Sequence, residues 1–186
     1  SAGCDRVVAL PDPAVSAIRK PPGVDLSVRI VHEQSRALCV LRGVVQPDAL
    51  ASDAGAMVTA WTGHGVGYAA SADLTPEGLQ AAADRAIQWA RLVDARGLFE
   101  GVVLPRPAAR GVVRTATAHR PLASRRGLIE QLRDEASALH SDARIVHWSA
   151  SVQLSQVTQR QYFGGELVSG ESFSYVVPNL EATAAS

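Results

Sequence analysis

The sequence has few of the residues that mark disulfide-rich, nucleic-acid-binding or membrane-spanning proteins. Cys4 and Cys39 are its only cysteines, too few for a disulfide framework and without the paired spacing of a zinc or redox motif. The formal net charge is zero, which disfavours a nucleic-acid partner because phosphate binding relies on excess positive charge. No run approaches the roughly 18 apolar residues of a membrane span. These features predict a cytoplasmic protein in a reducing compartment, with neither a nucleic-acid nor a membrane partner.

The remaining composition is that of an ordinary globular protein. The chain has 186 residues, of which 47% are hydrophobic and 19% are charged, so it can bury a substantial core. It begins Ser1-Ala2-Gly3 without a methionine, which is typical of an added or a cut end and leaves open whether the chain is a fragment of a longer gene product.

The strongest local pattern is a β-hairpin followed by a helix, between Gly55 and Ala90. Apolar and small residues alternate over 57–62, and Gly63-His64-Gly65 can form a tight turn into a partner strand over 66–69. Thr75 can cap a helix that starts at Pro76 and stops at Gly97. Its predicted apolar stripe contains Leu79, Ala82, Ala83, Ala86 and Ala90, widened by Ile87 and Trp89.

The segments before this hairpin suggest an arm and two further strands. Prolines punctuate residues 1–24, which predicts an N-terminal arm with a brief helix around 14–19 that packs on the domain. Alternation over 25–30 and an apolar run over 37–41 predict an antiparallel pair. Residues 43–52 contain Pro47 and Asp48 and are expected to form a connection.

The second half of the chain predicts one more helix and several strands. Residues 101–121 lack periodicity and contain prolines, as a surface connection or a strap across the sheet would. Ser124 can cap a helix whose apolar residues recur until about His140, and long alternation begins at Val146. Strands are also expected on both sides of Gly164-Gly165. We therefore predict one α+β domain over 25–186, a mainly antiparallel sheet with two principal helices packed on one face.

None of the familiar catalytic or metal patterns is complete. His32-Glu33 lacks a second histidine one helical turn later, since Arg36 and Ala37 stand there. The five histidines are dispersed, and Gly63 to Gly67 is followed by a strand rather than by the helix that a phosphate loop requires. Glu166 and Glu171 are better explained as solvated turn carboxylates than as an acid/base pair. We assign no catalytic and no metal-binding residue to this chain.

One surface could recognise a ligand. Ser149, Ser151, Gln153 and Ser155 alternate with apolar residues and should form a polar, uncharged strand face. Such a strand could accept an extended peptide by edge pairing, whose affinity comes from main-chain hydrogen bonds. The ordinary solvent face of a sheet explains the same pattern. These four residues are our candidates for peptide contact.

Several of these stretches together resemble a known family. Gly67-Tyr68-Ala69-Ala70-Ser71, then Asp73-Leu74-Thr75-Pro76-Glu77 and the alanine-rich helix, are similar to the N-terminal domain of the TldD/PmbA family. Residues 25–42 resemble its opening strand pair, and 142–146 with Phe163-Gly164-Gly165-Glu166 resemble its later strands. The resemblance spans roughly 25–182. The connection over 44–54 and the proline-rich arm depart from the family pattern.

The resemblance implies metal-dependent proteolysis of unfolded or peptide substrates by a two-subunit assembly. One subunit type carries an H-E-x-x-x-H motif in a C-terminal domain, which this chain does not contain. We therefore expect a domain that forms part of the substrate cleft and the subunit interface, is inactive alone, and forms homo- or heterodimers with a family member. Zinc is a candidate metal of the parent assembly, and the subunit type stays open. The alternative is a non-catalytic peptide-binding or assembly module that uses an exposed β face.

Overall fold

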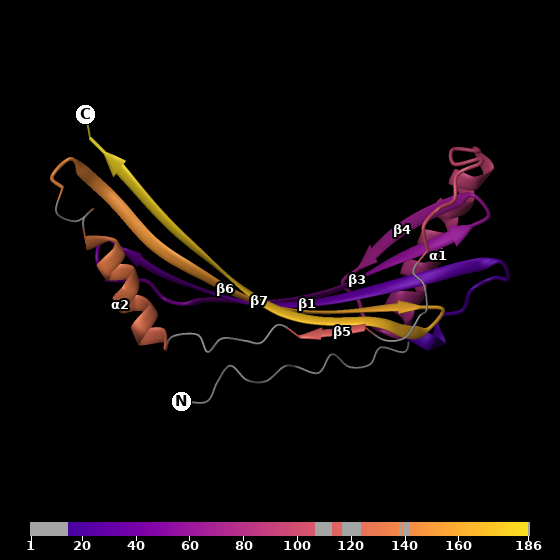
Figure 1. The fold of residues 1–186 in the computed structure, drawn as a ribbon, viewed down its shortest axis with the longest axis horizontal. Helices are drawn as coiled ribbons and strands as arrows, with labels where there is room; N and C mark the ends of the chain where they lie inside the picture. Colours follow the sequence, from indigo (N-terminus) through magenta and orange to yellow (C-terminus); the bar gives the residue numbers. More distant parts are fainter. Residues whose placement is uncertain (1–14, 107–112, 117–123, 138, 140–141, 186) are drawn as a thin grey trace. The chain divides into compact units, whose positions relative to one another are not determined.

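The computed structural model describes residues 15–106, 113–116, 124–137, 139 and 142–185. Two helices and seven strands make up most of this part of the chain (Figure 1). In chain order, the elements are the short 3-10 helix η1 (Val15–Ala17), β1 (Val24–Leu41), β2 (Val44–Val45), β3 (Ala49–Thr62), β4 (Gly65–Ser71), α1 (Pro76–Ala95), β5 (Val113–Ala116), α2 (Arg125–Glu135), β6 (Ile145–Phe163) and β7 (Glu166–Ala184).

The strands form one sheet in the order β4-β3-β1-β6-β7-β5, with β2 paired to β1. The hairpins β1–β2 and β3–β4 are antiparallel. The predicted α+β class with a mainly antiparallel sheet and packed helices is confirmed. Among the described residues, no helix is long and apolar enough to cross a membrane.

The described residues divide into two compact units. Unit 1 lies within 1–32, 54–115 and 158–171, and unit 2 lies within 33–53, 116–157 and 172–186. Each unit has its own hydrophobic cluster. The long strands β1, β3, β6 and β7 contribute residues to both units, and the single domain over 25–186 stays a prediction.

Unit 1 is built around the predicted hairpin and helix. Residues 56–62 pair with 65–71 as expected, and Thr75 caps α1 by accepting a hydrogen bond from the amide of Gly78 at 3.2 Å. The helix ends at Ala95, and Gly97 follows with a φ of 60°. Val15 of η1 is buried in the same core, so the part of the predicted arm that the structure describes does pack on the domain. Residues 1–14 lie outside the described residues.

Two glycines allow α1 to approach the hairpin closely. A Cβ atom on Gly65 would lie 2.0 Å from the carbonyl oxygen of Ala90, and one on Gly67 would lie 2.2 Å from that of Ala86. Real side chains do not tolerate such distances to backbone, so only glycine fits. Only Gly63 in the turn has a positive φ, of 49°. The glycines predicted to serve the turn therefore serve mainly helix packing.

Unit 2 has a smaller helix over larger side chains. Ser124 caps α2 by accepting a hydrogen bond from the amide of Gly127 at 3.1 Å, as predicted. Ile129 and Leu132 of α2 pack in a cluster with residues of β1 and β6: Leu38, Val40, Trp148, Ala150 and Val152. α2 ends at Glu135, and Ser137 and Leu139 beyond it are also helical. His140, where the predicted helix ends, lies outside the described residues.

Three local predictions were wrong. Residues 24–41 form one continuous strand instead of an antiparallel pair, because the polar run 33–36 is half-buried within the sheet rather than in a turn. The reversal follows at Arg42 and Gly43, with φ of 48° and 83°, and leads into β2, so the expected connection over 43–52 is mostly strand. Trp89 is 56% exposed and does not belong to the buried stripe of α1.

The predicted strap over 101–121 is only partly described. It contains β5, which pairs with β7. Residues 107–112 and 117–123 lie outside the described residues.

Candidate functional site

The four candidate peptide-contact residues lie on β6, which runs between β1 and β7. Ser149 and Ser151 are half-buried and Gln153 is exposed. They alternate with Trp148, Ala150 and Val152, which pack under α2, so they lie on the opposite face of the strand. Ser155 is only 2% exposed and is shielded from solvent. The structure thus brings three of the four residues to one accessible face.

The position of β6 inside the sheet changes what this face can do. Both edges of an internal strand are hydrogen-bonded to neighbouring strands, which leaves no free edge for a peptide backbone. The expected edge pairing therefore cannot take place at β6. Side-chain hydroxyl and amide groups are what this strand can offer a ligand.

Some of the polar groups on this face already form hydrogen bonds within unit 2. Ser149 Oγ donates to a carboxylate oxygen of Glu181 at 3.4 Å, and the Gln153 amide donates to Ser155 Oγ at 3.4 Å. Ser149 lies beside the carboxylate of Glu181, but their 3.4 Å separation is longer than that of an activated nucleophile–base pair, and Ser155 Oγ accepts from an amide and has no base beside it in these contacts. The face can bind polar groups, but its described contacts show no catalytic arrangement.

An ion-pair network lies at the start of α2. Arg125 Nη2 donates to Asp48 at 2.8 Å, and Arg36 Nε donates to the same carboxylate at 3.0 Å. These hydrogen bonds, from Arg125 first and Arg36 second, lower the pKa of Asp48 from 3.8 to about 2. Asp48, which directly precedes β3, is thus linked through its carboxylate to Arg125 of α2 and to Arg36 of β1. Its geometry indicates a structural role.

The described residues offer no metal site. They contain no group of three or more histidine, cysteine, aspartate or glutamate side chains that could hold a metal ion. His119 and His140 lie outside the described residues. The described part of the chain therefore does not fit the metal that the family resemblance implies, and no chemical step can be assigned to it.

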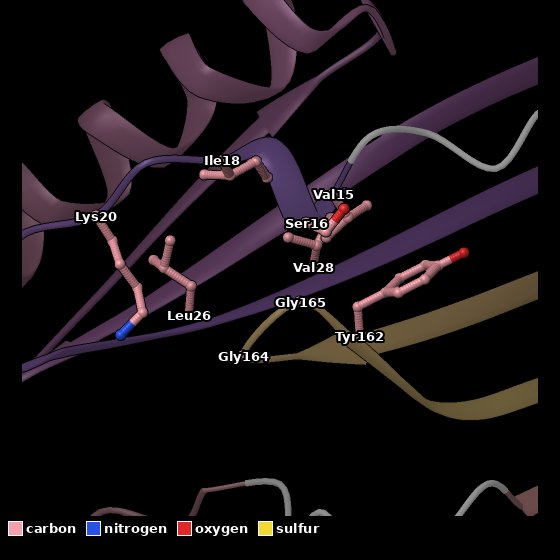
Figure 2. Close-up of a pocket in the computed structure, with 9 residues that line it drawn as sticks. All are labelled: Val15, Ser16, Ile18, Lys20, Leu26, Val28, Tyr162, Gly164 and Gly165. Atoms are coloured by element: carbon pink, nitrogen blue, oxygen red, sulfur yellow. The ribbon is translucent and has the colours of Figure 1, made fainter.

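A small cavity lies in unit 1 between η1 and the turn of the β6–β7 hairpin (Figure 2). Its volume is about 50 Å³, against roughly 300–1,000 Å³ for typical ligand pockets. Leu26 and Val28 form part of its apolar lining, while Lys20 donates a hydrogen bond to the carbonyl of Val24. The cavity is too small for more than a few solvent-sized atoms.

Together these features define the class of the protein: an α+β domain on one mainly antiparallel sheet, with an open polar strand face and no metal site among its described residues. Residues 26–90 match the family model described as PmbA/TldA metallopeptidase domain 1. The resemblance to the N-terminal domain of the TldD/PmbA family is confirmed. No curated protein matches the sequence.

Solved structures of other proteins share the fold. A protein of Thermotoga maritima described as a "putative modulator of a DNA gyrase" is 10% identical, with a TM-score of 0.59 over 92% of this chain. A protein of Bacteroides thetaiotaomicron with a similar description is 14% identical, with a TM-score of 0.54 over 91% of this chain. This chain spans 38% of the length of each.

Proposed function

We propose that this chain is the N-terminal substrate-cleft and assembly domain of a TldD/PmbA-like metal-dependent peptidase that acts on unfolded or peptide substrates. The observation that carries the proposal is the match of residues 26–90 to the first domain of that metallopeptidase family. The chain would bind substrate and a partner subunit, as a homo- or heterodimer in the cytoplasm. The metal, for which zinc is the candidate, would be held by another domain.

Peptide cleavage tests this proposal. The longer protein that contains this chain should degrade unfolded casein, should lose activity on addition of a chelator, and should regain it with zinc. A version lacking residues 25–186 should lose turnover of casein. Strong, chelator-sensitive cleavage by the 186-residue chain alone would contradict the proposal, as would a longer protein whose remaining sequence has no peptidase domain.

The second candidate function is a non-catalytic peptide-binding or assembly module. The accessible polar face of Ser149, Ser151 and Gln153 favours it, because neutral hydroxyl and amide groups can bind a peptide irrespective of its charge. Ser151→Arg and Gln153→Arg should then weaken binding of unfolded casein without any turnover. Unchanged affinity in both variants would exclude this face.

A further inference from the structure

The outer edge of β4 carries backbone groups that no described strand pairs. Among the described strands, β4 is at the end of the sheet and pairs only with β3. Its two-residue turn makes Thr62 and Gly65 a hydrogen-bonded pair, and such pairs alternate along a hairpin. Val66, Tyr68 and Ala70 therefore direct their N–H and C=O groups away from β3. Arg85 donates to the carbonyl of Ala70 at 3.1 Å, as this outward direction requires.

Large apolar side chains flank the same edge on both faces. On α1, Trp89 lies four residues after Arg85 and Leu92 lies three residues after Trp89, so the three side chains lie along one side of the helix. Trp89 is 56% exposed and Leu92 41% exposed. A Cβ atom on Gly67 would lie 2.8 Å from Cβ of Trp89, which places Trp89 directly against β4.

Tyr68 lines the opposite face of the edge. It alternates with Gly67, which faces α1, and its side chain is 58% exposed. An edge strand with exposed apolar neighbours is a template for another strand unless something covers it. The edge from Val66 to Ala70 would accommodate a segment of about five residues, or roughly 17 Å of extended chain.

These features restrict the chemistry of the occupant. Alternating outward N–H and C=O groups are matched by another extended backbone, and the flanking side chains favour apolar residues on both faces. Arg85 places a guanidinium at the Ala70 end, and a guanidinium favours a carboxylate there.

We propose that the outer edge of β4 binds an extended segment of an unfolded polypeptide as an added strand. Apolar side chains of the segment would contact Trp89 and Leu92 on one face and Tyr68 on the other, with an acidic group near Arg85. The proposal rests on the proposed peptide-directed function and assigns the binding to unit 1, whereas β6 has no free edge.

A peptide with blocked amides gives the most direct test. The probe is a fluorescein-labelled eight-residue peptide of alternating leucine and serine that ends in glutamate, with binding to the 186-residue chain followed by anisotropy. N-methylation of every second amide should weaken binding at least tenfold in one register and less than twofold in the other. Only the amides that face β4 contribute hydrogen bonds. Because only the peptide changes, this test does not disturb the folding of the protein.

A matched pair of variants tests the protein side. Tyr68→Pro removes an N–H that points outward and so leaves the bonds to β3 intact, while Tyr68→Thr keeps that N–H and removes the aromatic ring. The proline variant should bind at least tenfold more weakly than the threonine variant. Trp89→Ala should weaken binding about fivefold, and Gln88→Ala, on an exposed neighbouring position of α1, should leave it unchanged.

Three results would overturn the proposal. If N-methylation weakened peptide binding equally in both registers and Tyr68→Pro bound the peptide as tightly as the wild-type chain, β4 would not be the binding site. Weakened peptide binding by Ser151→Arg would then assign the peptide-binding function to β6. Sedimentation that shows a dimer which Tyr68→Pro dissociates would assign the edge to a second copy. Absence of binding by the wild-type chain up to millimolar peptide would also refute it, while casein cleavage by the longer protein decides the peptidase function separately.

Discussion

The two units stabilise their helices by different means. In unit 1, α1 has 20 residues, and its buried face consists mostly of alanines that pack against glycines of β4. In unit 2, α2 has 11 residues, buries Ile129 and Leu132 among large side chains, and begins beside the Asp48 ion pairs. The packing of α1 therefore depends on glycines that have no side chain, whereas the packing of α2 depends on large apolar side chains and on ion pairs. The same sheet thus supports a close-packed helix and a larger-residue helix with different sensitivities to mutation.

The largest expected effect is the loss of close packing in unit 1. Gly65→Ala would place a Cβ atom 2.0 Å from the Ala90 carbonyl, so α1 must move away from the sheet. The free energy of unfolding should fall by about 3 kcal/mol, the upper end of the usual range for an overpacked core. Chemical denaturation measures this, with Gly170→Ala as the control because a Cβ there meets nothing within 4 Å. Similar stabilities of the two variants would refute the packing role of Gly65.

A smaller effect is expected from acid in unit 2. The pKa of Asp48 is about 2 in the folded chain, below its ordinary value of 3.8, so its contribution to stability is present above pH 3.8 and is lost as the pH falls through 2. Asp48→Asn should lower the stability of unit 2 at pH 5 and flatten its decline between pH 5 and 2.

Hydrogen exchange of the α2 amides over this pH range follows the effect. Glu135→Gln, an exposed change in the same helix, serves as the control. An identical pH dependence in Asp48→Asn and the wild-type chain would show that the ion pairs do not stabilise unit 2.

Removal of the helix caps should affect the two helices to different extents along their length. Ser124→Ala and Thr75→Ala each remove one capping hydrogen bond, worth about 1 kcal/mol, or roughly fivefold in local opening. The effect on amide exchange should reach the whole of α2 but only the first turn of α1, because α1 buries more residues along its length. Equal spread of the faster exchange in both helices would argue against this difference.

The smallest effect concerns a buried hydroxyl in unit 1. Thr62 is 7% exposed, and its Oγ1 has no hydrogen-bond partner among the described residues. Thr62→Val keeps the shape and removes the unpaired oxygen, so stability should rise by up to about 1 kcal/mol. Thermal unfolding measures the change, with Thr59→Val on the same strand as the comparison. A destabilised Thr62→Val would indicate that the hydroxyl is hydrogen-bonded after all.

The elements with strong local signals could be predicted from the sequence. Alternation and capping residues defined the β3–β4 hairpin and the starts of α1 and α2, because those signals lie within a few residues of each other. The continuity of β1 through Glu33 could not be predicted, since it depends on pairing with strands distant in sequence. Alternation also predicted that Ser149, Ser151, Gln153 and Ser155, the candidates for peptide contact, share one strand, but the internal position of β6 in the sheet has no local signature. The exposure of Trp89 was missed because alanines fill the buried face of α1.

The unbroken length of β1 also bears on how the chain folds during synthesis. β1 ends at Leu41, and its neighbour β6 begins at Ile145, which leaves 103 residues (42–144) to be translated between them. At roughly 5–20 residues per second, one edge of β1 waits about 5–20 s for its partner. During this time the polar residues in the middle of the strand can protect it, because charged groups such as Glu33 and Arg36 discourage pairing with other nascent chains.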